Sequence, residues 1–224
     1  MKQLGKCSFT SIHNGKSNNS LRHLDEFPIL IRYNNALDII HKIRNKSNSF
    51  LSEMVSSINL FGFESSYRGS SKKGDNSIAL LSSKGKGFMD FNISSAQELI
   101  GKYKVVISRT ISEHAGEHGK DGKFKVLAKT MILSKNEICS HSYLVIGTFD
   151  NKKEALFLEN YLRTKFVRFL ILQTISGIDL SKERFMFVPL QDFSQPWTDE
   201  KLYKKYDLTI EEKDYIESMI RSME

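Results

Sequence analysis

Residues 114–118 read HAGEH and match the H-x-x-E-H pattern of one class of zinc protease. That chemistry requires both histidines on one face of a stable helix, with the glutamate beside a metal-bound water. Gly116, Gly119 and Gly122 interrupt the segment, so we do not expect a helix here. We interpret the segment as a polar, glycine-rich loop and predict no metal site in this chain.

Two short acidic runs, each followed by a lysine, could belong to a magnesium-dependent nuclease. Residues 199–201 (DEK) and 211–213 (EEK) match only the last part of such a nuclease pattern, an acidic residue two positions before a lysine. The candidate acids are Glu200, Glu211 and Glu212. Both runs stand where helices are expected to begin, and the helix dipole favours acidic residues there. Because no upstream strand aspartate is well placed, a nuclease that binds Mg²⁺ is the less favoured alternative.

Common nucleotide and cofactor motifs are not found in the sequence. It has no Walker loop and no dinucleotide-binding fingerprint. It also has no glycine-rich turn for a methyl-donor cofactor and no Asn/Asp-Pro-Pro-aromatic tetrapeptide, and its three prolines are never adjacent. No Ser/His/Asp or Cys/His pairing stands out. We therefore predict no catalytic residue and no bound cofactor in this chain.

With these motifs set aside, the remaining candidate functional residues are basic residues, most of them on predicted loops. Small residues let the backbone approach a phosphate group, and lysine or arginine supplies the charge. Arg109 directly follows a predicted strand and precedes a long loop, which suits an arginine fork aimed at a phosphate or a guanine. On a predicted helix, Lys165 and Arg168 are three residues apart and share a face. The loop candidates lie among glycines and serines: Arg68, Lys72, Lys73, Lys84 and Lys86.

The charge distribution points to the same part of the chain. The 224 residues carry 33 Lys and Arg against 26 Asp and Glu, a net charge of +7. Between Tyr67 and Lys135 there are 13 basic and 6 acidic residues, a local charge of +7. Residues 198–224 hold 5 basic and 8 acidic residues, a local charge of −3. This asymmetry predicts a polyanion-binding surface in the middle of the chain.

The composition is typical of a globular protein, with 40% hydrophobic and 26% charged residues. No apolar run approaches the ~20 residues that a membrane-spanning helix needs, so no membrane contact is expected. The first residues lack the apolar stretch of a secretory signal. Cys7 and Cys139 are predicted to be reduced thiols, and we expect a cytoplasmic location.

Hydrophobic spacing and turn signals predict the elements that position these residues. Residues 1–23 are interpreted as a polar lead-in, and 24–224 as a single α+β domain with a weak internal boundary near 146–150. We expect a mixed β-sheet in the middle of the chain, with strands at 78–81, 88–91, 104–107, 124–131 and 139–146. Helices are predicted at both ends, at 34–45, 50–57 and 151–175 and from 198 and 209 onward, with 184–189 extended.

Several stretches, taken in order, resemble a known family. They read LDEFPILIRY (24–33), FGF (61–63), ISRT (107–110), EHAGE (113–117), SYLVIG (142–147), TKFVRF (164–169), FVPLQDF (187–193) and WTD (197–199). This order is similar to the C-terminal region of adenine-specific DNA methyltransferases from bacterial type II restriction–modification systems. The bifunctional restriction–methylase enzymes, which combine a restriction endonuclease with a methyltransferase, are included. The similarity runs from residue 24 to the end of the chain.

In that family the region follows the catalytic domain and acts as the target recognition domain. The resemblance implies a fold of that kind, which grips double-stranded DNA and reads a short sequence. The implied contacts are the loop after Ile107, with Ser108, Arg109 and Glu113, and the segment 165–169. S-adenosylmethionine and methyl transfer would belong to a catalytic domain that this sequence lacks. Besides the nuclease, the other alternative is a protein-interaction subunit that docks onto the methyltransferase.

Overall fold

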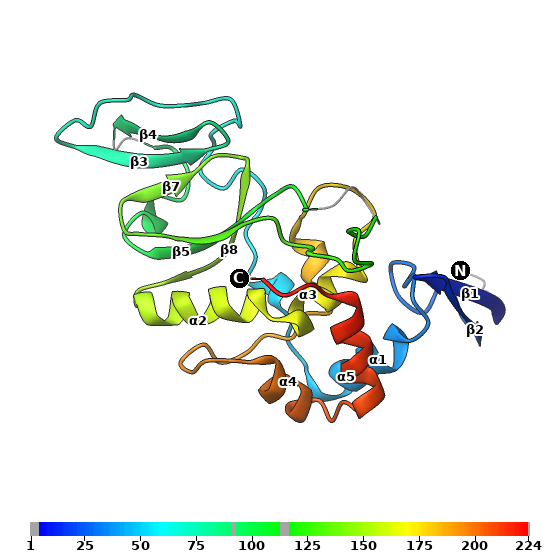
Figure 1. Ribbon diagram of the computed structural model, residues 1–224. Coiled ribbons are helices and arrows are strands. Elements are labelled where there is room, and N and C mark those ends of the chain that lie inside the picture. Colours follow the sequence, from blue (N-terminus) through cyan, green and yellow to red (C-terminus); the bar gives the residue numbers. More distant parts are fainter. Residues whose placement is uncertain (1–4, 91–92, 113–116, 224) are drawn as a thin grey trace.

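The computed structural model describes residues 5–90, 93–112 and 117–223. Within these ranges the chain has five α-helices, three short 3₁₀ helices and eight strands, which form three small sheets. The predicted α+β class is confirmed, but the strands do not form the one mixed sheet that we expected. Two three-stranded sheets lie at one end of the molecule, most helices lie below and beside them, and a two-stranded hairpin lies at the far end (Figure 1).

The first of these sheets carries the predicted hairpin. Strands β3 (Ser77–Ser82) and β4 (Gly85–Asp90) pair antiparallel, and β7 (Glu137–Cys139) adds to β3 in parallel. The strand predicted over 139–146 is divided between β7 and β8 (Tyr143–Phe149), because the backbone turns where Tyr143 N donates to Ser140 O.

The second sheet is antiparallel, in the order β6-β5-β8. Its central strand is β5 (Tyr103–Ser108), and its edge strand β6 (Thr130–Leu133) is much shorter than the strand predicted over 124–131. The two faces of β5 enter different cores, since side chains alternate along a strand. Val105 and Ile107 join the main core, whereas Val106 packs into a smaller core with β3 and β7.

The helix predicted over 151–175 is broken at Thr164. Its first part is α2 (Lys152–Arg163) and its second part is α3 (Lys165–Leu172). Thr164 has an extended backbone, with φ −60° and ψ 150°, and its hydroxyl accepts from Val167 N. The Asp199 carboxylate accepts from the first two amide groups of α3, those of Lys165 and Phe166, at 3.1 and 2.8 Å. A second helix therefore begins at this point, and both Thr164 and Asp199 cap its first amide groups.

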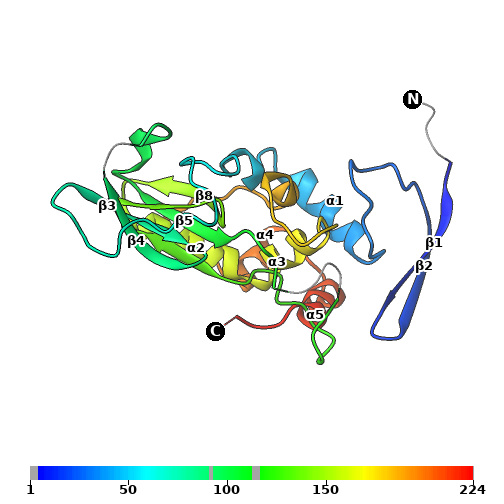
Figure 2. The same cartoon turned by 90° about the horizontal axis from the view of Figure 1, so that it is seen from above.

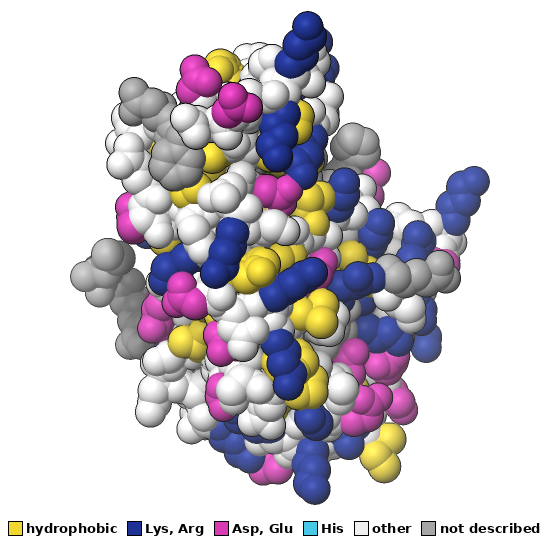
Figure 3. All heavy atoms as spheres, turned by 90° about the vertical axis from the view of Figure 1, so that its left-hand side faces the viewer, with side chains coloured by type: hydrophobic (Ala, Val, Ile, Leu, Met, Phe, Trp, Pro, Cys, Tyr) yellow, Lys and Arg dark blue, Asp and Glu magenta, His cyan; other side chains and the backbone are white. Residues whose placement is uncertain are grey.

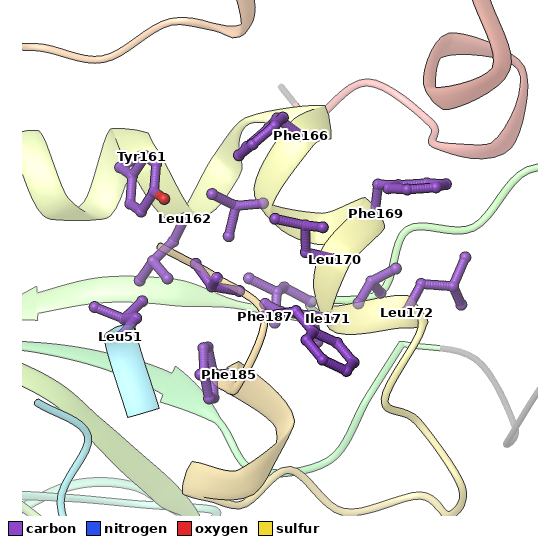
Figure 4. Packing of buried hydrophobic residues seen from close by; sticks show 14 of the residues in the cluster. Leu51, Tyr161, Leu162, Phe166, Phe169, Leu170, Ile171, Leu172, Phe185 and Phe187 are labelled. Atoms are coloured by element: carbon purple, nitrogen blue, oxygen red, sulfur yellow. The ribbon is translucent and has the colours of Figure 1, made fainter. Parts of the chain in front are cut away.

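Helix α3 forms the centre of the main core. All of its residues from Phe166 to Leu172 are buried, and they pack with Tyr161 and Leu162 of α2 and with Phe185 and Phe187 (Figure 4). Phe166 and Phe169 are both fully buried, so neither ring can serve as a base-stacking platform.

The remaining helices lie around α3. Helices α1 (Ala36–Lys46), α4 (Asp199–Lys205) and α5 (Ile210–Met219) begin close to the predicted positions. Thr209 and Glu212 form the predicted capping box of α5. The helix predicted at 50–57 shrinks to a 3₁₀ turn, Leu51–Glu53, and the segment expected to be extended at 184–189 begins within a 3₁₀ turn, Lys182–Phe185.

The segment interpreted as a polar lead-in, residues 1–23, contains regular structure in its described part. Strands β1 (Cys7–His13) and β2 (Lys16–Arg22) form an antiparallel hairpin that projects from the body (Figures 1 and 2). Asn14 and Gly15 at its turn both have positive φ, 49° and 73°, which is typical of an Asn-Gly hairpin turn. The Asn14 side chain donates to Gly122 O at 3.3 Å and so joins the hairpin to the loop after β5.

A buried lysine links β5 to the preceding turn. Lys104 has no exposed surface, and its ammonium group donates to Leu99 O and Ile100 O at 2.9 and 3.0 Å. Burial lowers the pKa of Lys104 to about 8. Both carbonyls also accept a backbone N–H, from Lys102 and Asn136, so they keep a partner without the lysine.

We expect the free energy of unfolding to rise between pH 8 and pH 10 because of Lys104. Its folded-state pKa lies below its unfolded value, so the unfolded chain binds more protons in this window and stability increases with pH. The increase is at most about 3 kcal/mol relative to Lys104→Met. Urea unfolding of both proteins across this pH range measures it, and parallel stability curves would contradict it.

Candidate nucleic-acid interface

Five of the predicted contact residues are gathered around one sheet. Arg68, Lys72 and Lys73 lie in the segment that precedes β3, Lys84 lies in the β3–β4 turn, and Lys86 lies on β4. All five are exposed. Lys86 forms an ion pair with Glu137 of β7, the strand on the far side of β3, so its charge is partly neutralised. We call these five residues the basic arm. Figure 3 shows Lys and Arg side chains scattered from the top to the bottom of one face of the molecule, with Asp and Glu side chains among them.

Two glycines place the first half of the basic arm directly on β4. Ser70 and Phe88 exchange two backbone hydrogen bonds, at 2.6 and 2.8 Å, so the segment pairs with β4 like an extra strand. Gly69 has φ +69°, and a Cβ there would lie 2.6 Å from Phe88 O. A Cβ on Gly87 would overlap the carbonyl oxygen of Arg68. Only glycine therefore permits this approach of the two backbones.

Replacement of Gly87 by alanine should release this segment from β4 while the rest of the fold remains. We expect faster amide exchange at Ser70 and Phe88 in Gly87→Ala. Gly74→Ala is the matched control, because a Cβ at Gly74 in the same loop would meet no atom within 4 Å. If the arm binds DNA, Gly87→Ala also lowers affinity by about tenfold. Unchanged protection at both amides would show that this contact does not hold the arm.

A polar cleft of about 520 Å³ lies where β5 ends and β8 begins, and Arg109 is its central cation. The Arg109 side chain is 17% exposed and forms an ion pair with Asp179, with Nη2 2.8 Å from Oδ2. Nη1 lies against the His141 ring, 3.0 Å from Nδ1. The backbone is held on both sides, since Arg109 N donates to Ser142 O and Leu180 N donates to Arg109 O. We call this pocket the Arg109 cleft.

Hydroxyl groups line much of the Arg109 cleft. Ser65 Oγ lies 3.3 Å from His141 Nδ1, and Ser83 Oγ donates to Ser65 O at 3.1 Å. Ser83 belongs to the β3–β4 turn, which also carries Lys84 of the basic arm as the next residue. The basic arm and the cleft therefore adjoin at this turn. The residues around the cleft are Ser65, Ser83, Ser108, Arg109, Thr110, His141, Ser142, Tyr143 and Asp179.

The sequence-predicted residues Ser108 and Arg109 both line this cleft, as their position after a strand suggested. Glu113 lies outside the described residues, as does part of the HAGEH segment. His141 and Asp179 were not predicted. They come from a turn between β7 and β8 and from a loop after α3, and no spacing in the sequence connects them to Arg109.

Two predicted contacts, Lys165 and Arg168, lie in the wrong place for a DNA surface. Arg168 is 1% exposed, and its guanidinium donates to the carbonyls of Arg163, Thr164, Lys125 and Arg221. Lys165 has a side chain that is 21% exposed and forms an ion pair with Glu217 of α5. Because the C-terminal segment covers this face of α3, both residues join chain segments inside the fold. Their burial and pairing do not suit contact with a DNA duplex.

The acids of the nuclease alternative do not meet at the Arg109 cleft. Glu211 and Glu212 lie in the first turn of α5, where Glu212 caps Thr209 and pairs with Lys42. Glu200 lies in the first turn of α4. Among the described residues, no group of three or more His, Cys, Asp or Glu is placed to hold a metal ion.

The comparisons with known proteins leave the chain without an assigned family. No family model matches it, and no curated protein matches its sequence. In the part of the chain that the structure describes, no helix has both the length and the apolar character needed to cross a bilayer.

Proposed function

We propose that this chain binds double-stranded DNA and reads a short sequence, as the target recognition domain of an adenine-specific DNA methyltransferase of a restriction–modification system. The observation that carries the proposal is the β3–β4 turn, which carries Lys84 of the basic arm and lines the Arg109 cleft through Ser83. The arm offers exposed cations on a segment fixed to a strand, and the cleft offers oriented donors and acceptors beside it. This combination suits a protein that positions itself on phosphates and reads base edges.

The basic arm would supply the affinity. Each lysine or arginine that neutralises a phosphate releases condensed counterions, so binding falls steeply as the salt concentration rises. Arg68, Lys72, Lys73 and Lys84 are exposed and lie on turns and loops, where the backbone can approach the duplex. Lys86 contributes less, because Glu137 already neutralises part of its charge.

The Arg109 cleft would supply the sequence preference. Asp179 and His141 hold the Arg109 side chain in one orientation, and this lowers the entropy cost of aiming it at a base. A guanine presents O6 and N7 acceptors that an arginine can bind with two hydrogen bonds. On binding, Arg109 would leave Asp179 and donate to the base instead. The negative charge of Asp179 would disfavour contact between this site and an arbitrary phosphate.

Methyl transfer and S-adenosylmethionine binding belong, in this proposal, to a separate catalytic domain or chain that acts with this one. The chain itself would contribute no catalytic residue, and a cytoplasmic location is part of the same proposal. The target adenine would leave the duplex only when that catalytic partner is present.

Replacement of Arg109 by alanine tests the cleft. We expect Arg109→Ala to reduce the preference for the best sequence by about 1–3 kcal/mol at one base pair. Asp179→Asn should raise affinity for all sequences, because it removes a carboxylate from the DNA-facing surface. Lys84→Ala is the control and should weaken binding to all duplexes equally. Binding of each protein to the preferred and singly mismatched duplexes gives these values. An Arg109→Ala protein with unchanged preference would remove Arg109 as a reader.

A further inference from the structure

A second basic pocket lies on the other side of β5 from the Arg109 cleft. It has a volume of about 690 Å³ and lies between the loop before β6, the end of α2 and the C-terminal segment. Among its lining residues, five are basic and Asp121 is the acidic one. We call it the basic groove. Its cations are Lys123, Lys125, Lys129, Arg163 and Arg221.

Backbone pairing builds one wall of the basic groove. Phe124 and Ile220 form a parallel bridge, in which Phe124 N donates to Met219 O and Arg221 N donates to Phe124 O. Phe124 is buried, so its neighbours Lys123 and Lys125 point to the opposite face of this extended segment. The bridge also brings Arg221, nearly 100 residues away in the sequence, to the same wall.

Arg168 fixes this wall from inside. Its Nη1 atom donates to Lys125 O at 3.1 Å and to Arg221 O at 2.7 Å, which ties the two paired segments to α3. Arg221 in turn forms a two-pronged ion pair with Asp121, at 3.0 and 2.7 Å. The backbone of the groove is thus held rigidly, which lowers the cost of ordering it around an anion.

The basic groove is joined to the Arg109 cleft through one backbone hydrogen bond. Ser108 N donates to Lys129 O at 2.9 Å, and Ser108 lines the cleft while Lys129 lines the groove. The two sites therefore lie at the same end of the β6-β5-β8 sheet. Because the arm meets the cleft at the β3–β4 turn, the arm, the cleft and the groove adjoin one another in that order.

We propose that the basic groove is a second phosphate-binding site, which holds the sugar–phosphate backbone of the bound DNA beyond the part that the arm contacts. Clustered lysine and arginine side chains, together with the Ser222 hydroxyl, suit phosphate oxygens. This inference rests on the proposed DNA binding and extends it: the protein covers a longer stretch of duplex than the arm and cleft alone would cover.

The double variant Lys125→Ala/Lys129→Ala tests the groove in the full chain. It removes two groove cations and leaves both backbone carbonyls in place. We expect the slope of log affinity against log salt to become shallower by about two. The gain in affinity between a duplex of about one helical turn and one of about two turns should also shrink. Lys152→Ala/Lys204→Ala, with the same charge change at exposed helical positions, should match the wild type.

Inorganic tripolyphosphate separates this inference from the proposed function. If the wild type binds no duplex, titration with tripolyphosphate by calorimetry still tests the groove, and binding that is lost in Lys125→Ala/Lys129→Ala would support a phosphate site without DNA. If the double variant and its control have the same salt slope on DNA, the groove does not contact the duplex. Failure of the wild type to bind either probe would overturn the proposal.

Discussion

Replacement of Arg168 by methionine is expected to lower the free energy of unfolding by about 2–4 kcal/mol, because several hydrogen bonds from a buried charged donor are lost together. Arg168 is 1% exposed, and its guanidinium joins α3 to the carbonyls of Lys125 and Arg221. Methionine keeps the length and apolar stem of the side chain, so the loss reports the hydrogen bonds rather than a cavity. Urea unfolding at constant pH measures the change.

Lys84→Ala is the comparison for this experiment, since Lys84 is exposed in a turn. Its free energy of unfolding should stay within about 0.5 kcal/mol of the wild type. The prediction from sequence had placed Lys84 and Arg168 in the same class of DNA contacts. A variant Arg168→Met that is as stable as the wild type but binds DNA poorly would restore Arg168 to that class and contradict its structural role.

The second large effect is expected on DNA affinity. Replacement of Arg68, Lys72, Lys73 and Lys84 together by alanine should lower the affinity for any duplex by about 10³-fold or more at ~0.1 M salt, since each phosphate contact contributes roughly eightfold there. The salt slope should fall by about three to four at the same time. Stability should change little, because all four side chains are exposed.

A matched variant controls for net charge alone. It changes four exposed lysines away from the arm to alanine and should retain most of the affinity, because long-range charge acts weakly beyond a Debye length of about 10 Å. Equal losses in the two quadruple variants would mean that total charge, not the basic arm, determines binding. The four control positions are Lys16, Lys152, Lys182 and Lys204.

Local signals in the sequence predicted the elements whose boundaries are set locally. The capping box of Thr209 and Glu212 starts α5 within the same turn, and the glycine-containing turn after Ser82 joins β3 to β4. The break at Thr164 was not predictable in this way. The carboxylate that caps the new helix belongs to Asp199, 33 residues from Phe166, and helical spacing continues through the break.

The N-terminal hairpin had a local signal that its polar composition concealed. Asn14-Gly15 is a strong turn pair, but β1 and β2 expose most of their residues on both faces and so lack the usual alternation of apolar and polar residues.

The same distinction applies to the candidate site. The role of Arg109 as a candidate contact was predictable, because a basic residue that directly follows a strand lies at the end of the sheet, where it can reach a ligand. His141 and Asp179, which orient it, are 32 and 70 residues further along the chain and meet it only through the fold. Arg168 was misplaced because helical spacing gives the shared face of Lys165 and Arg168 but not what covers that face.

Sequence-specific DNA binding is tested most directly by selection from a random-sequence duplex library over a salt series. Mg²⁺ is present, and the lengths of the products are checked. We predict enrichment of a short motif, intact DNA, and affinity that falls steeply with salt. Enrichment should weaken in Arg109→Ala and overall binding should weaken in the arm variant. Cleaved products would favour the nuclease instead, and absence of binding even at low salt would contradict a DNA-binding role for this chain.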